Sequence, residues 1–249
     1  MQLLNLLKND MALGVFSKTL DSAFVEAAGI GGLDFIILDQ EHGAVGLETL
    51  HNHVRAAKLT NMTSIIRVKG VDSHAIGSAL DTGAGGVQVP NINTAEQAQA
   101  AVNAARFHPL GQRGVCRFVR AAAFGSQDKT QYFQKANESL LVLQVEGLEG
   151  VSNLNAILDV HGFDVLFVGP YDLSQSVGKP GEVNSPEVLS LMREIAAKAQ
   201  AKGIILGAFC DTQENAKLLR REGFTYMAYS VDINLYLEAC KQLKGLIYE

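Results

Sequence analysis

The sequence predicts an α/β protein with a (β/α)₈ TIM barrel fold, and three observations support this prediction. Eight short apolar segments recur along the chain, longer amphipathic stretches separate them, and the length of 249 residues suits one barrel. The apolar segments are nearly continuous in Val, Ile, Leu and Phe, which is typical of parallel strands that are buried on both faces. We therefore expect residues 1–249 to form a single TIM-barrel domain. An open doubly wound sheet is the rival fold, but no GxGxxG motif follows the first apolar segment.

The eight apolar segments are the expected strands. They span 13–16, 35–39, 64–68, 86–90, 140–146, 165–169, 204–209 and 226–230. Helices with recognisable boundaries are expected at 22–30, 94–107, 185–203 and 212–223. Gly31 is a plausible C-cap of the first, Thr94 and Gln97 have the spacing of a capping box at the start of the second, and Ser185 with Pro186 begins the third.

Residues 106–139 break this alternation. The segment is longer than an ordinary loop, so we expect it either to serve function or to contain structure of its own. Arg106, Arg113, Arg117 and Arg120 make it the most basic part of the chain. Whether the loop around Arg113 belongs to an active site or to a subunit contact stays open at this point.

Composition excludes several classes of function. With 26 acidic and 21 basic residues the net charge is −5, so no broad positive surface for a nucleic acid is expected. No apolar run reaches the roughly 18 residues of a membrane span, and the N-terminus lacks the features of a signal peptide. The 3 cysteines are too scattered for a disulfide framework or a zinc site, so we expect a cytoplasmic protein. Neither a P-loop nor a GxSxG motif is present.

Polar residues follow several of the expected strands, and in a TIM barrel these positions form the active site. Glu146 ends the fifth strand and Asp172 follows the sixth. Neighbouring strands lie about 4.8 Å apart, so the two carboxylates could share one divalent cation such as Mg²⁺ or Mn²⁺. The alternative is that each carboxylate caps the following helix or pairs with an arginine.

Two more candidates lie after the second strand and within the third. His42 follows two acids beyond a strand end, where it could act as a general base or simply cap a helix. Arg67 lies inside an apolar strand, and a buried arginine requires an anionic partner. It could bind a substrate carboxylate or enolate oxygen, or it could form a structural ion pair with Asp39 or Asp81.

The turn at 169–174, which contains Tyr171, could offer backbone N–H groups to an anion or could be an ordinary capped turn.

Several motifs together resemble the HpcH/HpaI family of class II pyruvate aldolases. They are LDQEHG (38–43), IIRV (65–68), GAGGVQVPNINTAEQA (83–98), HPLGQRGV (108–115), LQVEGLEGVSNLNAIL (143–158) and FVGPYDLSQSVG (167–178). Each motif alone is weak evidence, but the combination is specific. The motifs occur in the order of the family along nearly the whole chain.

The resemblance implies roles for particular residues. Glu146 and Asp172 match the metal ligands of the family, which are occupied by Mg²⁺, Mn²⁺ or Co²⁺. His42 matches the proposed base, and Asp81 matches the acid that supports it. Arg67 matches the residue that steadies the pyruvate enolate.

The same resemblance implies further substrate contacts, a reaction and an assembly. Gln144 matches a pyruvate-contacting residue, and we count Arg67, Tyr171 and Asp172 with it as substrate-binding. The implied reaction is the metal-dependent cleavage or formation of 4-hydroxy-2-oxo acids, through a metal-bound enolate, with pyruvate and an aldehyde as the partners. The implied assembly is a homo-oligomer, a hexamer or a trimer, in which the last helix packs onto a neighbouring subunit.

Two departures from the family put the electrophile in doubt. Gly43, Ala44 and Val45 stand where many members have Ala-Pro or Ser-Pro, and the tryptophan that usually follows the arginine-rich loop is missing. Three alternatives therefore remain: a citrate-synthase-like enzyme that condenses an enolate with a keto acid, an acyl-CoA-linked lyase, and a non-catalytic barrel that only binds a 2-oxo acid. A phosphate-binding isomerase is disfavoured, because the turns after the last two strands are acidic and poor in glycine.

Overall fold

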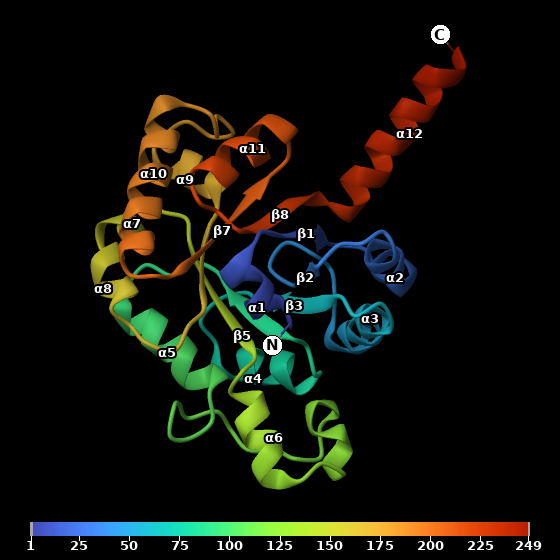
Figure 1. Ribbon diagram of the computed structural model, residues 1–249, viewed down its shortest axis with the longest axis vertical. Coiled ribbons are helices and arrows are strands. Elements are labelled where there is room, and N and C mark those ends of the chain that lie inside the picture. Colours follow the sequence, from blue (N-terminus) through green and yellow to red (C-terminus); the bar gives the residue numbers. More distant parts are fainter. Residues whose placement is uncertain (1, 249) are drawn as a thin grey trace.

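The computed structural model describes residues 2–248, and within them eight parallel strands close into a barrel (Figure 1). The order around the barrel is the order in the chain, from β1 to β8, with β8 paired to β1. The strands are β1 (Ala12–Ser17), β2 (Phe35–Asp39), β3 (Thr63–Arg67), β4 (Gly86–Val89), β5 (Leu140–Val145), β6 (Val165–Val168), β7 (Ile205–Cys210) and β8 (Tyr226–Val231). The TIM barrel prediction is confirmed, and every expected strand is present with boundaries that differ by at most one residue.

Helices connect the strands, and most of them cover the outside of the barrel (Figure 1). They are α1 (Gln2–Asn9), α2 (Ser22–Ile30), α3 (Leu47–Leu59), α4 (Ser73–Asp81), α5 (Ala95–Ala105), η1 (Arg120–Gly125), α6 (Lys129–Ala136), α7 (Leu148–Ser152), α8 (Leu154–Leu158), α9 (Pro170–Ser176), α10 (Pro186–Ala201), α11 (Gln213–Arg221) and α12 (Asp232–Tyr248). The predicted capping box of α5 is present, because the Thr94 hydroxyl accepts the N–H of Gln97 while the Gln97 side chain accepts the N–H of Thr94. Ser185 caps α10 as expected, and Gly31 follows α2, although the left-handed residue there is Gly32.

The core consists of two apolar layers because successive strand residues point to opposite faces. Ile36 of β2 belongs to the layer between barrel and helices, whereas Ile37 belongs to the layer inside the barrel. Inside, Phe35 stacks on Tyr226 with ring centroids 4.1 Å apart. Leu3 of α1 packs into this inner layer, so α1 covers the end of the barrel at which the strands begin (Figure 1).

The register of the strands sets the level of the site residues. Asp39 at the end of β2 lies opposite Arg67 at the end of β3, and Arg67 in turn lies opposite Gln88 of β4. Three polar side chains are thereby brought to the same level near the C-terminal ends of three consecutive strands.

The segment 106–139 contains structure of its own, as expected. It includes η1 and α6. Its arginines bind to backbone carbonyls or to acids. Arg106 donates to the carbonyl of Gly162 and forms a 3.0 Å ion pair with Asp164, while Arg120 donates to the carbonyl of Thr82. These arginines fix the segment to the barrel.

Helix α12 differs from the others because it projects away from the barrel (Figure 1). Its apolar side chains are largely exposed, among them Leu243, Leu246 and Ile247. None of the helices within residues 2–248 is both long enough and apolar enough to cross a membrane.

Candidate active site

A cavity of about 200 Å³ lies at the C-terminal end of the barrel, where TIM barrel enzymes have their active sites. The polar side chains on its wall are Lys18, His42, Arg67, Gln144, Tyr171 and Asp172. Phe16, Phe167 and Phe209 supply apolar surface, with the Phe16 ring centroid 6.2 Å from that of Phe167. Five of the six polar residues are predicted site residues, and only Lys18 is new.

Arg67 is the centre of an ion-pair cluster on the β2–β3 side of the cavity. Its Nε and Nη2 donate to the two carboxylate oxygens of Asp39 at 2.9 and 2.8 Å, and its Nη1 lies 3.0 Å from Oε2 of Glu41. The guanidinium carbon lies 4.7 Å from the centroid of the Phe16 ring, so the ring packs against one face of it. Of the two ion pairs considered from the sequence, the one with Asp39 is formed.

The two acids of this cluster have opposite pKa shifts. Burial of Asp39 by itself would raise its pKa, but the hydrogen bonds and the charge of Arg67 outweigh burial and hold the pKa below its ordinary value. Burial raises the pKa of Glu41 above its ordinary value, although the charge of Arg67 works in the other direction. The bidentate pair of Asp39 and Arg67 is therefore the stable ionic part of this cluster.

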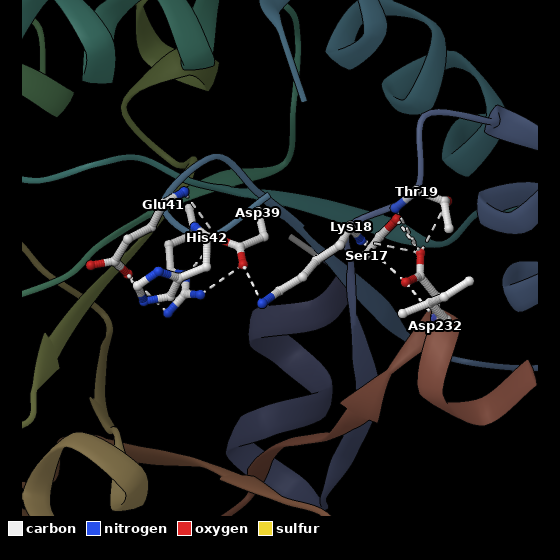
Figure 2. Close-up of polar contacts among 9 residues, drawn as sticks. Ser17, Lys18, Thr19, Asp39, Glu41, His42 and Asp232 are labelled. Carbon is white, nitrogen blue, oxygen red and sulfur yellow. Dashed lines mark hydrogen bonds and ion pairs between the residues drawn. The ribbon is translucent and has the colours of Figure 1, made fainter. Parts of the chain in front are cut away.

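His42 lies at the rim of the cavity, next to these acids. Its side chain is 60% exposed, its Nε2 lies 4.0 Å from Oε2 of Glu41, and its backbone N–H donates to Oδ1 of Asp39 at 3.3 Å. Figure 2 shows His42 beside Glu41 and Asp39. The imidazole can therefore reach a molecule in the cavity while the acids next to it fix the turn from which it projects.

Asp81 has a different partner from the one that we expected. It is the last residue of α4, which runs from the C-terminal end of β3 back toward the start of β4, so it lies at the opposite end of the barrel. There its Oδ1 accepts a 2.6 Å hydrogen bond from Arg113. Within one chain, His42 is therefore supported by Asp39 and Glu41 instead of Asp81, and the loop around Arg113 lies away from the cavity.

Glu146 and Asp172 form the acidic side of the site, at the ends of the neighbouring strands β5 and β6. Glu146 is 6% exposed, and its Oε1 accepts the N–H of Asn91 at 2.9 Å while its Oε2 accepts from the side-chain amide of Gln144. Gln144 in turn accepts from the amide of Gln88. Asp172 lies in the first turn of α9 and lines the cavity.

The environment of Glu146 disfavours an isolated negative charge. Burial raises its pKa to about 7 against the hydrogen bond from Gln144, and the nearby charge of Asp172 adds to the rise. The charge of Asp172 also contributes to the raised pKa of Glu41. Three acids thus lie within electrostatic reach of one another around this part of the cavity.

These residues fit a divalent cation. A Cβ atom added to Gly169 would fall 2.6 Å from Oε2 of Glu146, so the glycine keeps open the space beside that oxygen. Two carboxylates supply hard oxygen ligands and negative charge, which Mg²⁺ and Mn²⁺ prefer, and water or substrate oxygens complete such sites. The described part of the chain contains no group of three or more His, Cys, Asp or Glu residues placed to hold a metal.

Asn91 connects the two sides of the cavity. It follows β4, and while its backbone N–H binds Glu146, its side-chain amide donates to Oε1 of Glu41 at 3.0 Å. Its φ of 58° lies in the left-handed region, which asparagine tolerates better than most residues. The sequence shows Asn91 after a strand but gives no sign of its two partners, which the fold alone brings together.

Tyr171 lies between the cavity and the end of β7. Its hydroxyl donates to Oδ2 of Asp211, and this hydrogen bond, together with burial, raises the pKa of Tyr171 to about 12. Its ring centroid lies 5.9 Å from that of Phe209. The phenol is therefore a neutral, fixed part of the cavity wall.

The fold and the site define a class of enzyme: a parallel barrel with a buried arginine, a histidine and an aspartate around one cavity and a buried glutamate next to it. The chain belongs to the HpcH/HpaI aldolase/citrate lyase family, whose family model matches residues 12–239. It is a class II aldolase, a carbon–carbon lyase, and class II aldolases of this family generally depend on a divalent metal ion.

Individual relatives support this assignment. The chain is 36% identical to 2-keto-3-deoxy-L-rhamnonate aldolase of Salmonella paratyphi B over 93% of this chain and 87% of that protein. A crystal structure of a family member from Burkholderia cenocepacia has a TM-score of 0.94 and 30% identity, covering 100% of this chain and 99% of that chain. Citrate synthase SbnG has a TM-score of 0.88 and 28% identity, covering 99% and 97%.

Proposed function

We propose that this aldolase cleaves and forms 4-hydroxy-2-oxo acids, with pyruvate and an aldehyde as the other side of the reaction. The observation that carries the proposal is the convergence of Arg67, His42, Gln144 and Asp172 on one cavity, with the buried Glu146 within electrostatic reach of Asp172. Each of these side chains would have a function in the chemistry of an enolate.

The acid pair would hold the divalent cation, for which we propose Mg²⁺, Mn²⁺ or Co²⁺. Glu146 and Asp172 would bind it on one side and leave its other positions to the 2-oxo acid. A cation in this place would act as a Lewis acid and lower the free energy of the enolate. Gln144 holds Glu146 in place through its side-chain amide, and its position on the cavity wall lets it contact the substrate.

Arg67 would stabilise the oxyanion that develops during the reaction. A guanidinium has five N–H donors. The two hydrogen bonds to Asp39 occupy two of them, and Nη1 contacts Glu41 as an ion pair without a hydrogen bond. The remaining N–H donors are available because Arg67 lines the cavity. The bidentate pair with Asp39 fixes the plane of the guanidinium. Preorganised donors of this kind stabilise developing charge without reorganisation.

His42 would move the proton. In the cleavage direction, its imidazole would take the proton of the C4 hydroxyl, directly or through a water molecule, while the bond between C3 and C4 breaks. Its exposure at the cavity rim lets the proton pass on to solvent, and the nearby carboxylate of Glu41 can steady the ring when it carries charge. In the synthetic direction the same nitrogen would return the proton to the new alkoxide.

We also propose that the chain works as one aldolase domain in a homo-oligomer, a trimer or a hexamer, in the cytoplasm. The exposed apolar residues of α12 support association, because a helix that projects alone from the barrel leaves these side chains in water. Cys116, Cys210 and Cys240 are free, which agrees with a reducing compartment.

The proposed reaction can be tested by release of pyruvate from a panel of 4-hydroxy-2-oxo acids. We expect pyruvate to appear with at least one of them, to stop after treatment with EDTA, and to return when Mg²⁺, Mn²⁺ or Co²⁺ is added. Binding of 2-oxo acids without turnover under all these conditions would instead favour a non-catalytic barrel.

A citrate-synthase-like reaction is the second candidate, and the likeness to citrate synthase SbnG favours it. That reaction would use the same acid pair and the same arginine, but the electrophile would be a keto acid instead of an aldehyde. Condensation with a keto acid and no turnover of any aldehyde would select this candidate.

A further inference from the structure

Lys18 is the one charged group of the cavity that the proposed mechanism leaves without a function. It follows β1 directly, its side chain lines the cavity, and that side chain is 33% exposed. Its Nζ lies 3.6 Å from Oδ2 of Asp39, and among residues 2–248 it makes no hydrogen bond. Figure 2 shows the ammonium group directed toward Asp39 from the opposite side to His42.

Asp39 does not need Lys18 as a partner. Both of its carboxylate oxygens already accept hydrogen bonds of 2.9 and 2.8 Å from Arg67, and Oδ1 also accepts backbone N–H groups of the following turn. The ammonium group of Lys18 therefore retains donors that can bind a molecule in the cavity.

The turn that carries Lys18 is held in place by Asp232, the first residue of α12. The carboxylate of Asp232 accepts from the hydroxyl of Ser17 at 2.7 Å, from the backbone N–H of Lys18 at 3.2 Å, and from the hydroxyl of Thr19 at 3.1 Å (Figure 2). Asp232 is 8% exposed, so these hydrogen bonds are largely shielded from water. Lys18 thus starts from a fixed backbone, although lysine side chains are usually mobile.

Lys18 also lies across the cavity from the acid pair. β1 and β5 are four strands apart in a barrel of eight, so the end of β1 is opposite the end of β5, which Glu146 follows. A 2-oxo acid bound at the acid pair would present its nucleophilic carbon to the middle of the cavity. The electrophile that this carbon attacks would then lie on the side of Lys18.

We propose that Lys18 binds a carboxylate of the electrophile, so that the preferred electrophile is an aldehyde or keto acid with a negative charge. This inference rests on the proposed function. In the bond-forming step, C3 of pyruvate loses a proton to a base and forms a bond with the carbonyl carbon of the electrophile. The carbonyl oxygen takes up a proton, and the carboxylate at Lys18 is unchanged.

The test compares two electrophiles of equal carbon number, glyoxylate and glycolaldehyde, in condensation with pyruvate in the metal-loaded enzyme. We expect kcat/KM to be higher for glyoxylate. In the variant Lys18→Gln, that value should fall by about ten- to a hundredfold, the effect of a lost charge-assisted hydrogen bond, whereas the value for glycolaldehyde changes little. Lys18→Arg, which keeps the charge, should retain most of the preference.

Two further variants test whether the effect of Lys18→Gln comes from lost binding of the carboxylate and not from a general loss of positive charge. Lys69 is an exposed lysine just beyond β3 at the same end of the barrel, so Lys69→Gln removes an equal charge and should leave the preference for glyoxylate unchanged. Asp232→Asn weakens the support of the turn and should raise KM for glyoxylate less than Lys18→Gln does.

Equal losses for glyoxylate and glycolaldehyde in Lys18→Gln, or no preference for glyoxylate in the unaltered enzyme, would overturn the inference. Exchange of the pyruvate methyl protons in D₂O, measured on the unaltered enzyme without any electrophile, reports on the proposed function separately. An enzyme that exchanges these protons but prefers glycolaldehyde would refute the function of Lys18 and leave the proposed function intact.

Discussion

The two sides of the cavity hold their charges in different ways. On the β2–β3 side, the chain supplies both signs, and Arg67 holds the pKa of Asp39 below its ordinary value. On the β5–β6 side, no lysine or arginine of the described residues pairs with Glu146 or Asp172, and burial raises the pKa of Glu146 to about 7. On the β2–β3 side, the negative charge of Asp39 is balanced by Arg67 of the same chain. On the β5–β6 side, the carboxylates lack such a partner within residues 2–248, which suits a cation from outside the chain. The difference is consistent with the proposed division of function, in which the acid pair, and not the cluster around Arg67, holds the cation.

Arg67→Ala should have the largest effect on activity and stability, because it breaks the ion-pair cluster on the β2–β3 side. Turnover should fall by about 10²–10³-fold, which is typical for the loss of a donor to an oxyanion. The free energy of unfolding should also fall by about 3–5 kcal/mol, since the fully buried Asp39 loses its partner. Steady-state kinetics and urea unfolding measure the two effects, and an active variant of unchanged stability would contradict this account of the cluster.

Glu146→Gln should reduce activity as well but should leave stability unharmed. Turnover should fall by more than about 100-fold, which is the upper end for residues that only support a metal ligand. The metal-free variant should be at least as stable as the metal-free unaltered protein, because a buried carboxylate without a cationic partner is removed. Thermal unfolding in EDTA is the measurement, and a marked loss of stability would show that Glu146 has a structural function.

Binding of a divalent metal ion should stabilise the folded protein, and this stabilisation should depend on the acid pair and not on Arg67. At a concentration 100 times the dissociation constant, a ligand of the native state adds about 2.7 kcal/mol. For a chain of this length, that free energy corresponds to a rise in Tm of roughly 5–10 °C. The same rise is expected in Arg67→Ala, whose acid pair is intact, and none is expected in Glu146→Gln. Equal rises in all three proteins would place the metal elsewhere.

The stability difference between the unaltered protein and Arg67→Ala should depend on pH. The folded-state pKa of Asp39 is lowered, so the ion pair contributes stability above the ordinary value of 3.8, and this contribution is lost as pH falls through the lowered value. The difference should therefore be largest near neutral pH and become smaller below pH 3.8. Urea unfolding from pH 7 to pH 3 tests this, and a constant difference would mean that the pair is not the cause.

The sequence predicts most of the fold because strands that are buried on both faces consist of nearly continuous apolar residues. It also predicts Arg67, Glu146 and Asp172 as site residues, because polar side chains at the ends of such runs serve no packing purpose. The choice of Asp39 as the partner of Arg67 depends on the register between β2 and β3, which the sequence does not show.

Two other residues show further limits of the sequence. The family resemblance pairs Asp81 with His42, and this pair does not form within one chain, because the end of a helix that follows a strand lies at the far end of the barrel. Lys18 was missed because it follows a strand as a single charged residue, which usually indicates a solvated position. Its support by Asp232, which is more than 200 positions away in the chain, is visible only after the barrel closes.

The central claim is that the acid pair holds a divalent cation that promotes enolisation of a 2-oxo acid. Exchange of the methyl protons of pyruvate in D₂O, followed by mass spectrometry without an electrophile, tests it most directly. We expect exchange in the metal-loaded enzyme, its loss in EDTA and its return with Mg²⁺, Mn²⁺ or Co²⁺. Exchange that continues at full rate in EDTA would contradict the claim.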